Sequence, residues 1–141
     1  MPVVVDANVA IKWILIEDLH LQARRLIEEE GENIHVPDLL LPETANIAWK
    51  KLREGKMTRT QVEEGLVKIL DCLEFIYPSS TLLRRAMALS IAADHPIYDC
   101  FYLACAEAAD AVLITADRRL LATADRAGFA HLARHLADIP P

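Results

Sequence analysis

The sequence predicts an α/β domain of three layers, in which helices cover both faces of a central parallel sheet of four to five strands. Short apolar segments alternate with longer segments of helical periodicity along the 141 residues, which is typical of repeated strand–helix–strand units. The first apolar segment, Val3 to Asp6, starts with three consecutive valines, as expected of a strand buried on both faces. The sequence contains no linker, repeat or low-complexity segment, so we expect a single domain over residues 1–141.

Strands and helices are expected in a regular alternation. The strands are predicted at residues 3–6, 33–37, 74–78 and 111–115, and the tail after Phe129 is a candidate for an edge strand. The helices are predicted at residues 9–14, 18–30, 38–55, 58–73, 79–92, 96–109 and 117–127. Pro42 should kink the 38–55 helix or restart it at Glu43, because proline removes a backbone hydrogen bond.

Two helix starts carry residues that favour capping. Thr58 and Gln61 have the spacing of a capping box, in which each side chain accepts from the other residue's backbone N–H. Ser79 or Ser80 is expected to cap the helix that follows the third strand. Both signals support the boundaries given above.

The net charge of −6 does not favour nucleic acid as a partner of the whole molecule. The charge is uneven, however, because the segment KKLREGKMTR, from Lys50 to Arg59, has five basic residues and one acidic residue. Such a strip can bind phosphates, although a solvated helix face would have the same composition.

Composition also indicates where the protein resides. No apolar run approaches the ~18 residues that a membrane helix needs, and Asp6 interrupts the only candidate for a signal peptide. The three cysteines are odd in number and form no CxxC motif, which favours reduced core thiols. We therefore expect a cytoplasmic protein without a membrane segment. The four glycines are scattered, so no glycine-rich phosphate loop is present.

Two acidic residues follow predicted strands. Asp6 ends the first strand, and Asp117 comes two residues after Thr115, which ends the fourth. Open parallel sheets bind ligands at the carboxyl ends of their strands, so these side chains should meet at one edge. Each aspartate taken alone could instead be a helix N-cap.

Two further acidic residues lie in apolar helices. Asp99 should be buried within IYDCFYLACA, where an unpaired carboxylate is costly and needs a salt bridge to an arginine or a metal ion. Glu43 lies in the first turn of its helix, where the helix dipole alone would favour it.

Four converging carboxylates would need a cation. Two charges ~5 Å apart repel by roughly 3 kcal/mol at an effective dielectric constant near 20. Ligand sets made only of oxygen select Mg²⁺ or Mn²⁺ over zinc, and such a site suits the hydrolysis of phosphodiesters. Asn8 and Thr115 could orient ligands or water without adding charge.

Four segments together resemble the PIN-domain ribonucleases, in particular toxins of the VapC kind from toxin–antitoxin pairs. These segments are VVVDANVAIKW, LLLPETANIAW, HPIYDCFYLACA and VLITADRRL, which span nearly the whole chain in the order of the family. The resemblance implies a PIN-like fold and Mg²⁺-dependent endonucleolytic cleavage of RNA, with Mn²⁺ as a substitute ion. It also implies homodimers, and an antitoxin whose tail wraps the toxin and blocks its active site.

The resemblance also implies the roles of individual residues. Four acidic residues bind the metal and serve catalysis in the family, and they match Asp6, Glu43, Asp99 and Asp117. Asn8 and Thr115 match polar residues that support this set. The family often has Thr or Ser directly after its first aspartate, where this chain has Ala7.

Basic and aromatic residues near these segments are candidates for other contacts. Our candidates for binding the RNA backbone are Lys12, Lys50, Lys51, Arg53 and Arg118, each of which could equally be a solvated surface residue. The aromatic residues are expected in the core or a dimer interface, and these are Trp13, Trp49, Phe101 and Tyr102. His131 and His135 could share a helix face, but no third zinc ligand accompanies them.

Two other functions remain open from the sequence. An α/β phosphohydrolase or phosphoacceptor of another family would also place aspartates at strand ends, although Asn8 replaces the second acid of a D-x-D nucleophile site. A catalytically inactive PIN-like module that only binds a partner is the other alternative, and the complete acidic set argues against it.

Overall fold

Five parallel strands form the centre of the computed structural model, which describes all 141 residues. They are β1 (Val3–Val5), β2 (Ile34–Pro37), β3 (Phe75–Tyr77), β4 (Val112–Thr115) and β5 (Ala133–His135). Their order in the sheet is β3-β2-β1-β4-β5, and every neighbouring pair is parallel. The predicted parallel sheet is confirmed, and the tail supplies its fifth strand at one edge.

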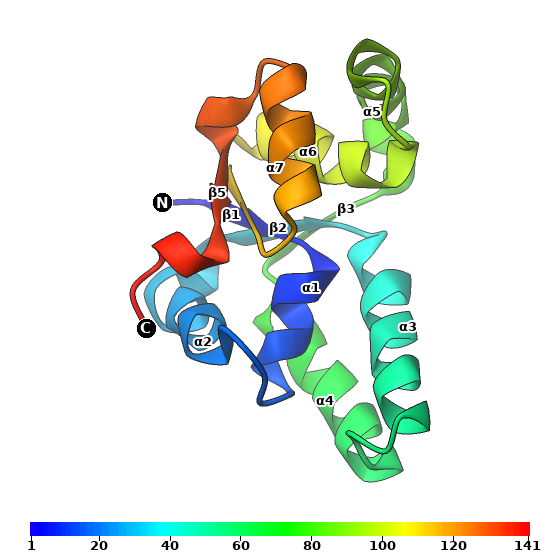
Figure 1. Cartoon of the computed structure of the whole chain (residues 1–141), viewed down its shortest axis with the longest axis vertical. Coiled ribbons are helices and arrows are strands. Elements are labelled where there is room, and N and C mark those ends of the chain that lie inside the picture. The colour runs from blue at the N-terminus through cyan, green and yellow to red at the C-terminus, as the bar shows by residue number, and fades with distance from the viewer.

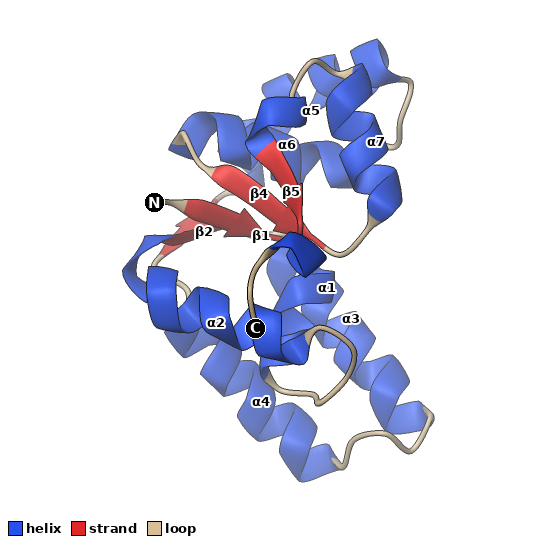
Figure 2. Cartoon of the chain, turned by 60° about the vertical axis from the view of Figure 1, so that its left-hand side comes forward, coloured by secondary structure: helices blue, strands red, loops and turns tan.

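Helices cover both faces of this sheet, as Figures 1 and 2 show from two directions. One layer holds α1 (Ala7–Ala10), α2 (His20–Glu30), α3 (Leu40–Arg53) and α4 (Arg59–Cys72). The other holds α5 (Ser79–Ala93), α6 (Ile97–Ala109) and α7 (Arg118–Arg126). Short 3-10 turns occur at Ile11–Trp13, Gly31–Asn33, Ala130–Leu132 and Leu136–Asp138. The predicted three-layer α/β fold is confirmed.

The strand order explains this division of the helices. The chain moves outward from β1 through β2 to β3, and then returns across the sheet to β4 and β5 on the other side of β1. Parallel crossovers are right-handed, so reversing the direction moves the connecting helices to the opposite face. The reversal also creates a crevice at the carboxyl ends of β1 and β4, where open sheets of this type bind ligands.

The core lies on both sides of the central strands. Val3, Val4 and Val5 are buried, as the uninterrupted run of valines predicts. The run from Cys100 to Ala106 of α6 is also buried, because this helix packs against β1, β2 and β4. Edge strand β3 is different, since Phe75 is about half exposed.

The start of α3 differs from the expectation. The helix begins at Leu40 and runs through Pro42 to Arg53 without restarting at Glu43. Proline is tolerated there because the first turn of a helix has no partner for that N–H group. The expected restart at Glu43 was therefore wrong, and Glu43 lies in the first turn of a helix that begins at Leu40.

The two capping expectations have different outcomes. The Thr58–Gln61 capping box is confirmed, with the Gln61 N–H 3.1 Å from Thr58 Oγ1 and the Thr58 N–H 2.8 Å from Gln61 Oε1. At the start of α5 neither serine caps the helix. The backbone N–H of Ser79 instead donates to Asp38 Oδ2 at 3.1 Å, and its hydroxyl group donates to the same carboxylate. The Asp38 carboxylate, distant in sequence, therefore accepts the N–H group at the start of α5 in place of a local serine cap.

The cysteines form no disulfide. Cys100 and Cys105 are buried and Cys72 is partly buried, as expected of core thiols. Burial raises the pKa of Cys105 to about 12, so this thiol has no tendency to ionise at neutral pH. Among the helices, none has both the length and the apolar character required to cross a membrane.

Candidate metal centre and active site

An acidic cavity of about 230 Å³ lies next to the carboxyl ends of β1 and β4. Its lining residues come from α1, α3, α6 and the turns after β1 and β4: Asp6, Ala7, Asn8, Glu43, Asn46, Ile47, Lys50, Asp99, Tyr102 and Asp117. All four carboxylates predicted from the sequence line this one cavity, together with Asn8. They come from segments that are far apart in the chain, so the fold has assembled the set.

Asp6 is both a helix cap and a wall of the cavity. Its Oδ1 accepts the Val9 N–H at 3.0 Å, and its Oδ2 accepts the hydroxyl group of Thr115. Burial raises the pKa of Asp6 from 3.8 to about 6, although these two hydrogen bonds oppose the shift. The negative charges of Asp117 and Asp99 raise it further. The two roles considered for Asp6 are thus compatible.

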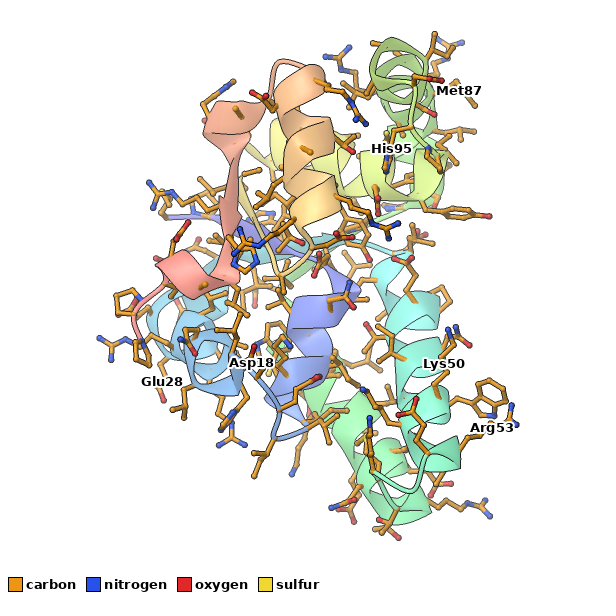
Figure 3. The ribbon with its side chains drawn as sticks, viewed as in Figure 1. Asp18, Glu28, Lys50, Arg53, Met87 and His95 are labelled. Carbon is orange, nitrogen blue, oxygen red and sulfur yellow. The ribbon has the colours of Figure 1, made fainter.

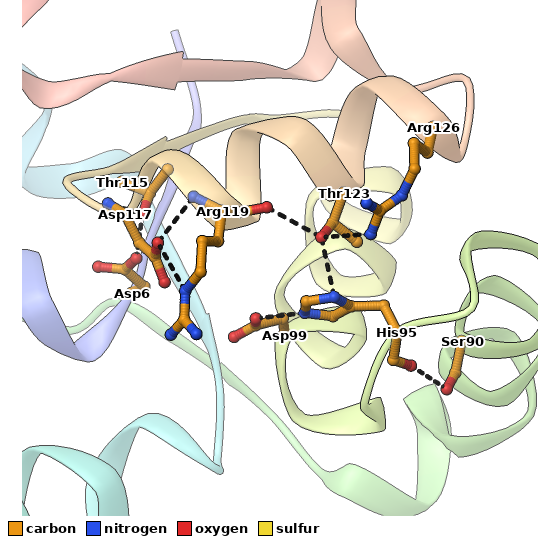
Figure 4. A network of polar contacts seen from close by, with 9 residues as sticks. All are labelled: Asp6, Ser90, His95, Asp99, Thr115, Asp117, Arg119, Thr123 and Arg126. Carbon is orange, nitrogen blue, oxygen red and sulfur yellow. Dashed lines mark hydrogen bonds and ion pairs between the residues drawn. The ribbon is translucent and has the colours of Figure 1, made fainter.

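Thr115 and Asp117 continue this arrangement at the end of β4. The Thr115 Oγ1 atom accepts the Asp117 backbone N–H at 2.9 Å, while its own hydrogen goes to Asp6 (Figure 4). Asp117 caps α7 by accepting the Arg119 N–H at 2.8 Å. The fully buried threonine therefore ties the ends of β1 and β4 together.

Glu43 approaches the cavity from α3, and Tyr102 approaches it from α6. The Tyr102 hydroxyl donates to Glu43 Oε1 at 2.6 Å. Burial raises the pKa of Glu43, the hydrogen bond from Tyr102 opposes that effect, and the charge of Asp99 adds to it. Tyr102 is buried as predicted, but no pattern in the sequence indicates that its hydroxyl group reaches the acidic set.

Asp99 differs from its expected environment. Its side chain is 32% exposed, and its partner is His95 rather than an arginine. The His95 Nε2 atom lies 2.7 Å from Asp99 Oδ2, and Nδ1 lies 3.1 Å from Thr123 Oγ1 (Figure 4). The i, i+4 spacing of His95 and Asp99 is the one sequence signal that could have indicated this pair.

The donor set can be tested for its fit to a metal ion. Each carboxylate accepts a hydrogen bond from the protein. No three His, Cys, Asp or Glu side chains lie close enough together to coordinate one metal ion as they stand. The chemistry nevertheless fits a hard divalent cation, because the acidic ligands offer only oxygen atoms. Burial is the main cause of the raised pKa of Asp6, and the charges of Asp117 and Asp99 add a smaller repulsion that a cation would relieve.

Basic side chains extend from the cavity along α3. Lys50 lines the cavity and also a neighbouring hollow formed with Trp49, Arg53 and Glu54. Lys50 and Arg53 project from the outer side of the helix in Figure 3. The Arg53 guanidinium group lies 5.0 Å from the centre of the Trp49 ring, which is 49% exposed. Trp49 is therefore not in the core, which leaves the dimer interface of the two positions expected for it, whereas Trp13 and Phe101 are buried as expected.

The other predicted cations lie outside the cavity wall. Lys12 is buried, and its Nζ atom lies 3.6 Å from Glu17 Oε2. This amine has an acidic partner of its own and presents no free cation, so the expected RNA contact of Lys12 is not retained. Lys51 is partly buried and Arg118 is exposed.

The two C-terminal histidines do not share a helix face. His131 lies in a 3-10 turn, and His135 ends strand β5. The His135 Nδ1 atom accepts the Ala137 backbone N–H at 3.0 Å, so this ring already serves as a cap. The helix face that the two rings could have shared does not form, because the chain enters the edge strand expected after Phe129.

Together, the fold and the cavity define a class of α/β protein whose acidic site lies at the switch point of an open parallel sheet. Residues 3–126 match the family model of the PIN domain. The chain is 30% identical over 122 residues to Ribonuclease VapC3 of Pyrobaculum aerophilum, covering 85% of this chain and 92% of that protein. It is 32% identical over 118 residues to Ribonuclease VapC9 of Mycobacterium tuberculosis, covering 84% and 87%. The chain belongs to the PIN-domain family and is of the VapC kind.

The fold comparison agrees with this assignment. The crystal structure of PAE2754 from Pyrobaculum aerophilum matches with a TM-score of 0.73 and covers 97% of this chain and 92% of its own. The two sequences are 22% identical in that alignment, so this likeness concerns the fold alone.

Proposed function

We propose that the protein is a Mg²⁺-dependent endoribonuclease, able to use Mn²⁺, that hydrolyses RNA phosphodiester bonds in the acidic cavity. The observation on which this depends is the meeting of Asp6, Glu43, Asp99 and Asp117 in one cavity. The names of the VapC relatives, which are ribonucleases, support the reaction class. Three of these acids, Asp6, Asp99 and Asp117, would hold the cation, with Glu43 as a direct or water-mediated fourth ligand.

A bound Mg²⁺ supplies positive charge that neutralises the phosphate and lowers the pKa of water. The residues of the chain supply orientation and proton transfer. Tyr102 occupies Oε1 of Glu43, which leaves Oε2 without a hydrogen bond from the protein. The pKa of Glu43 is raised, and unlike Asp6, whose two oxygens both accept hydrogen bonds, Glu43 keeps one oxygen free to accept a proton from the attacking water.

Two neutral residues complete the proposed centre. Thr115 fixes the orientation of Asp6 through its hydroxyl group and adds no charge. Asn8 is exposed and lines the cavity, where its carboxamide can donate to a phosphate oxygen. Because these two neutral residues would orient Asp6 and contact the phosphate, the carboxylates would be left to bind the cation.

Helix α3 provides the proposed path for the RNA strand. It begins beside Glu43 and ends with Lys50, Lys51 and Arg53, so negative charge at the metal centre gives way to positive charge. The distance along the helix axis from Glu43 to Arg53 is about 15 Å, enough for a few nucleotides. The exposed ring of Trp49 offers a face on which a base can stack.

The proposal includes a cytoplasmic location, a homodimer and an antitoxin partner. The VapC names of the relatives support a protein partner that restrains the nuclease. An exposed apolar stripe on α5, formed by Leu83, Met87 and Ile91, supports contact with a second copy. The three free thiols suit a reducing compartment.

The proposed reaction is tested with labelled RNA and the purified protein. Wild type should cleave in Mg²⁺ and not in excess chelator, and Asp6→Asn and Asp99→Asn should fall to background. The matched control is Asp71→Asn, an exposed acid on α4 that should cleave like wild type. Equal cleavage by wild type and Asp6→Asn would refute the assignment. A labelled phosphoenzyme would indicate the phosphohydrolase instead, and absence of any reaction would indicate the inactive module.

A further inference from the structure

His95 joins three helices at the edge of the acidic cavity (Figure 4). Its ring bridges Asp99 on α6, at 2.7 Å, and Thr123 on α7, at 3.1 Å. Its main chain is attached to the end of α5, because Ser90 Oγ donates to the His95 carbonyl at 2.5 Å. The His95 N–H donates in turn to the Ser90 carbonyl at 3.1 Å.

The local backbone fixes the direction of this side chain. Asp94 ends α5 in the left-handed region, with φ of 49°, and Pro96 precedes the first residue of α6. Proline restricts the residue before it to extended conformations. The His95 side chain is only 16% exposed, so the ring has little freedom to turn away from Asp99.

Asp99 is held by one oxygen atom only. Oδ2 contacts His95, whereas Oδ1 accepts no hydrogen bond from the protein, and Asp99 lines the cavity. Carboxylates that bind metals are commonly oriented by such an outer hydrogen bond, and losing that partner typically costs about 10–100-fold in metal affinity or activity.

The same ring connects two acids of the proposed centre. Thr123 Oγ1 also contacts the Arg119 carbonyl, at 2.9 Å, within the helix that Asp117 caps. Asp99 is therefore linked through His95 and Thr123 to α7, the helix that begins beside Asp117. A shift of this helix would change the spacing between the two carboxylates.

We propose that His95 is a positioning residue for the metal centre, which holds Asp99 by Oδ2 so that Oδ1 would be free to bind the cation. This inference depends on the proposed function, and it assigns His95 no contact with RNA. The contribution of His95 is the hydrogen bond at Nε2, while the contact at Nδ1 keeps the ring in place.

Two amide variants separate positioning from a merely structural role. The amide nitrogen of glutamine reaches about as far as Nε2, and that of asparagine about as far as Nδ1. We expect His95→Gln to keep the donor to Asp99 and to bind Mn²⁺ almost like wild type in calorimetry. We expect His95→Asn to bind Mn²⁺ about 10–100-fold more weakly. In RNA cleavage at saturating Mn²⁺, His95→Asn should lower kcat and leave KM for RNA near the wild-type value.

A second histidine of the chain provides the control for this experiment. His20→Asn changes another partly buried histidine, at the start of α2, and should leave Mn²⁺ affinity unchanged. Equal losses in His95→Gln and His95→Asn that follow their thermal stability would assign His95 a structural role and overturn the inference. Wild-type affinity in both variants would also overturn it, while the proposed function would stand. If wild type itself neither bound Mn²⁺ nor cleaved RNA, both proposals would fail.

Discussion

The hydroxyl group of Tyr102 donates to Glu43 Oε1 at 2.6 Å, joining α6 to the first turn of α3 in the wall of the acidic cavity. This hydrogen bond opposes the rise in the pKa of Glu43 that burial and Asp99 produce. Tyr102→Phe should therefore raise the pKa of Glu43 further. If Glu43 accepts the proton from water, the acidic limb of the kcat/KM profile should move to higher pH.

The matched control for this change is Tyr98→Phe, because Tyr98 is 61% exposed on the same helix. Tyr102→Phe should also lower the free energy of unfolding by about 1.5–3 kcal/mol, the usual range for a hydrogen bond to a charged group. An acidic limb that stays in place while cleavage continues would remove Glu43 from the role of general base.

Asp6 should give the metal-free protein a characteristic dependence of stability on pH. Its pKa is raised from 3.8 to about 6, so between these values the folded state binds more protons than the unfolded state. The contribution is fully present below pH 3.8 and is lost as pH rises through about 6, by about 3 kcal/mol in total. Thermal unfolding in chelator from pH 4 to 8 should show this loss in wild type and a flatter profile in Asp6→Asn.

Added Mn²⁺ supplies the second part of this experiment. Because the cation favours ionised Asp6, it should stabilise wild type more at pH 8 than at pH 4. A concentration of one hundred times Kd corresponds to about 2.7 kcal/mol. The interpretation of Asp6 would be wrong if its asparagine variant kept the same pH profile as wild type.

The Trp49–Arg53 pair should contribute to RNA affinity rather than to chemistry. Binding can be measured with a short unpaired RNA on an Asp6→Asn background, so that cleavage does not interfere. Trp49→Ala should weaken binding by about 1–3 kcal/mol if a base stacks on the ring. Arg53→Gln should lower the slope of log K against log salt by about 1 if it contacts a phosphate.

Arg25→Gln on α2 is the control for Arg53, since Arg25 is exposed and paired with Glu29 in its own helix. It should leave both affinity and salt slope unchanged. Equal behaviour of the Arg25 and Arg53 variants would show that the RNA does not follow α3.

The apolar stripe on α5 should contact a second copy of the chain. Met87, labelled in Figure 3, lies between Leu83 and Ile91 at helical spacing and is 46% exposed. Burying an unpaired carboxylate there would cost several kcal/mol, so Met87→Glu should shift a dimer to monomer in sedimentation experiments. Val67→Glu, at an exposed apolar position on α4, should not. A wild-type protein that sediments as a monomer at micromolar concentration would contradict the homodimer.

The sequence allowed the strand-end acids to be predicted on physical grounds. Asp6 and Asp117 follow apolar strands, and the rule for open parallel sheets requires such ends to share one edge. Glu43 and Asp99 lie in helices whose tilt and rotation depend on tertiary packing, so their place in the set came from the family resemblance. The fold class was accessible for the same reason as the strand ends, because alternating apolar segments permit few topologies.

The residues that sequence reasoning missed or misplaced depend on packing between elements. Tyr102 and His95 lie beside apolar neighbours, and their polar atoms reach Glu43 and Asp99 only through the packing of the helices. Lys12 follows the first strand closely, but a 3-10 turn directs it to Glu17. Trp49 has an apolar neighbourhood in sequence, yet it lies on the outer face of α3.

The hydrogen bond between Thr115 and Asp6 joins residues that are 109 positions apart. During synthesis on the ribosome, the first strand therefore leaves the exit tunnel long before its neighbour β4 exists. Contacts between such distant segments also slow folding, because the long intervening loop must be closed. Under the proposed function, a prematurely terminated chain would lack the last acid and be inert. Under this proposal the acidic site is complete only after β4 and Asp117 have been synthesised.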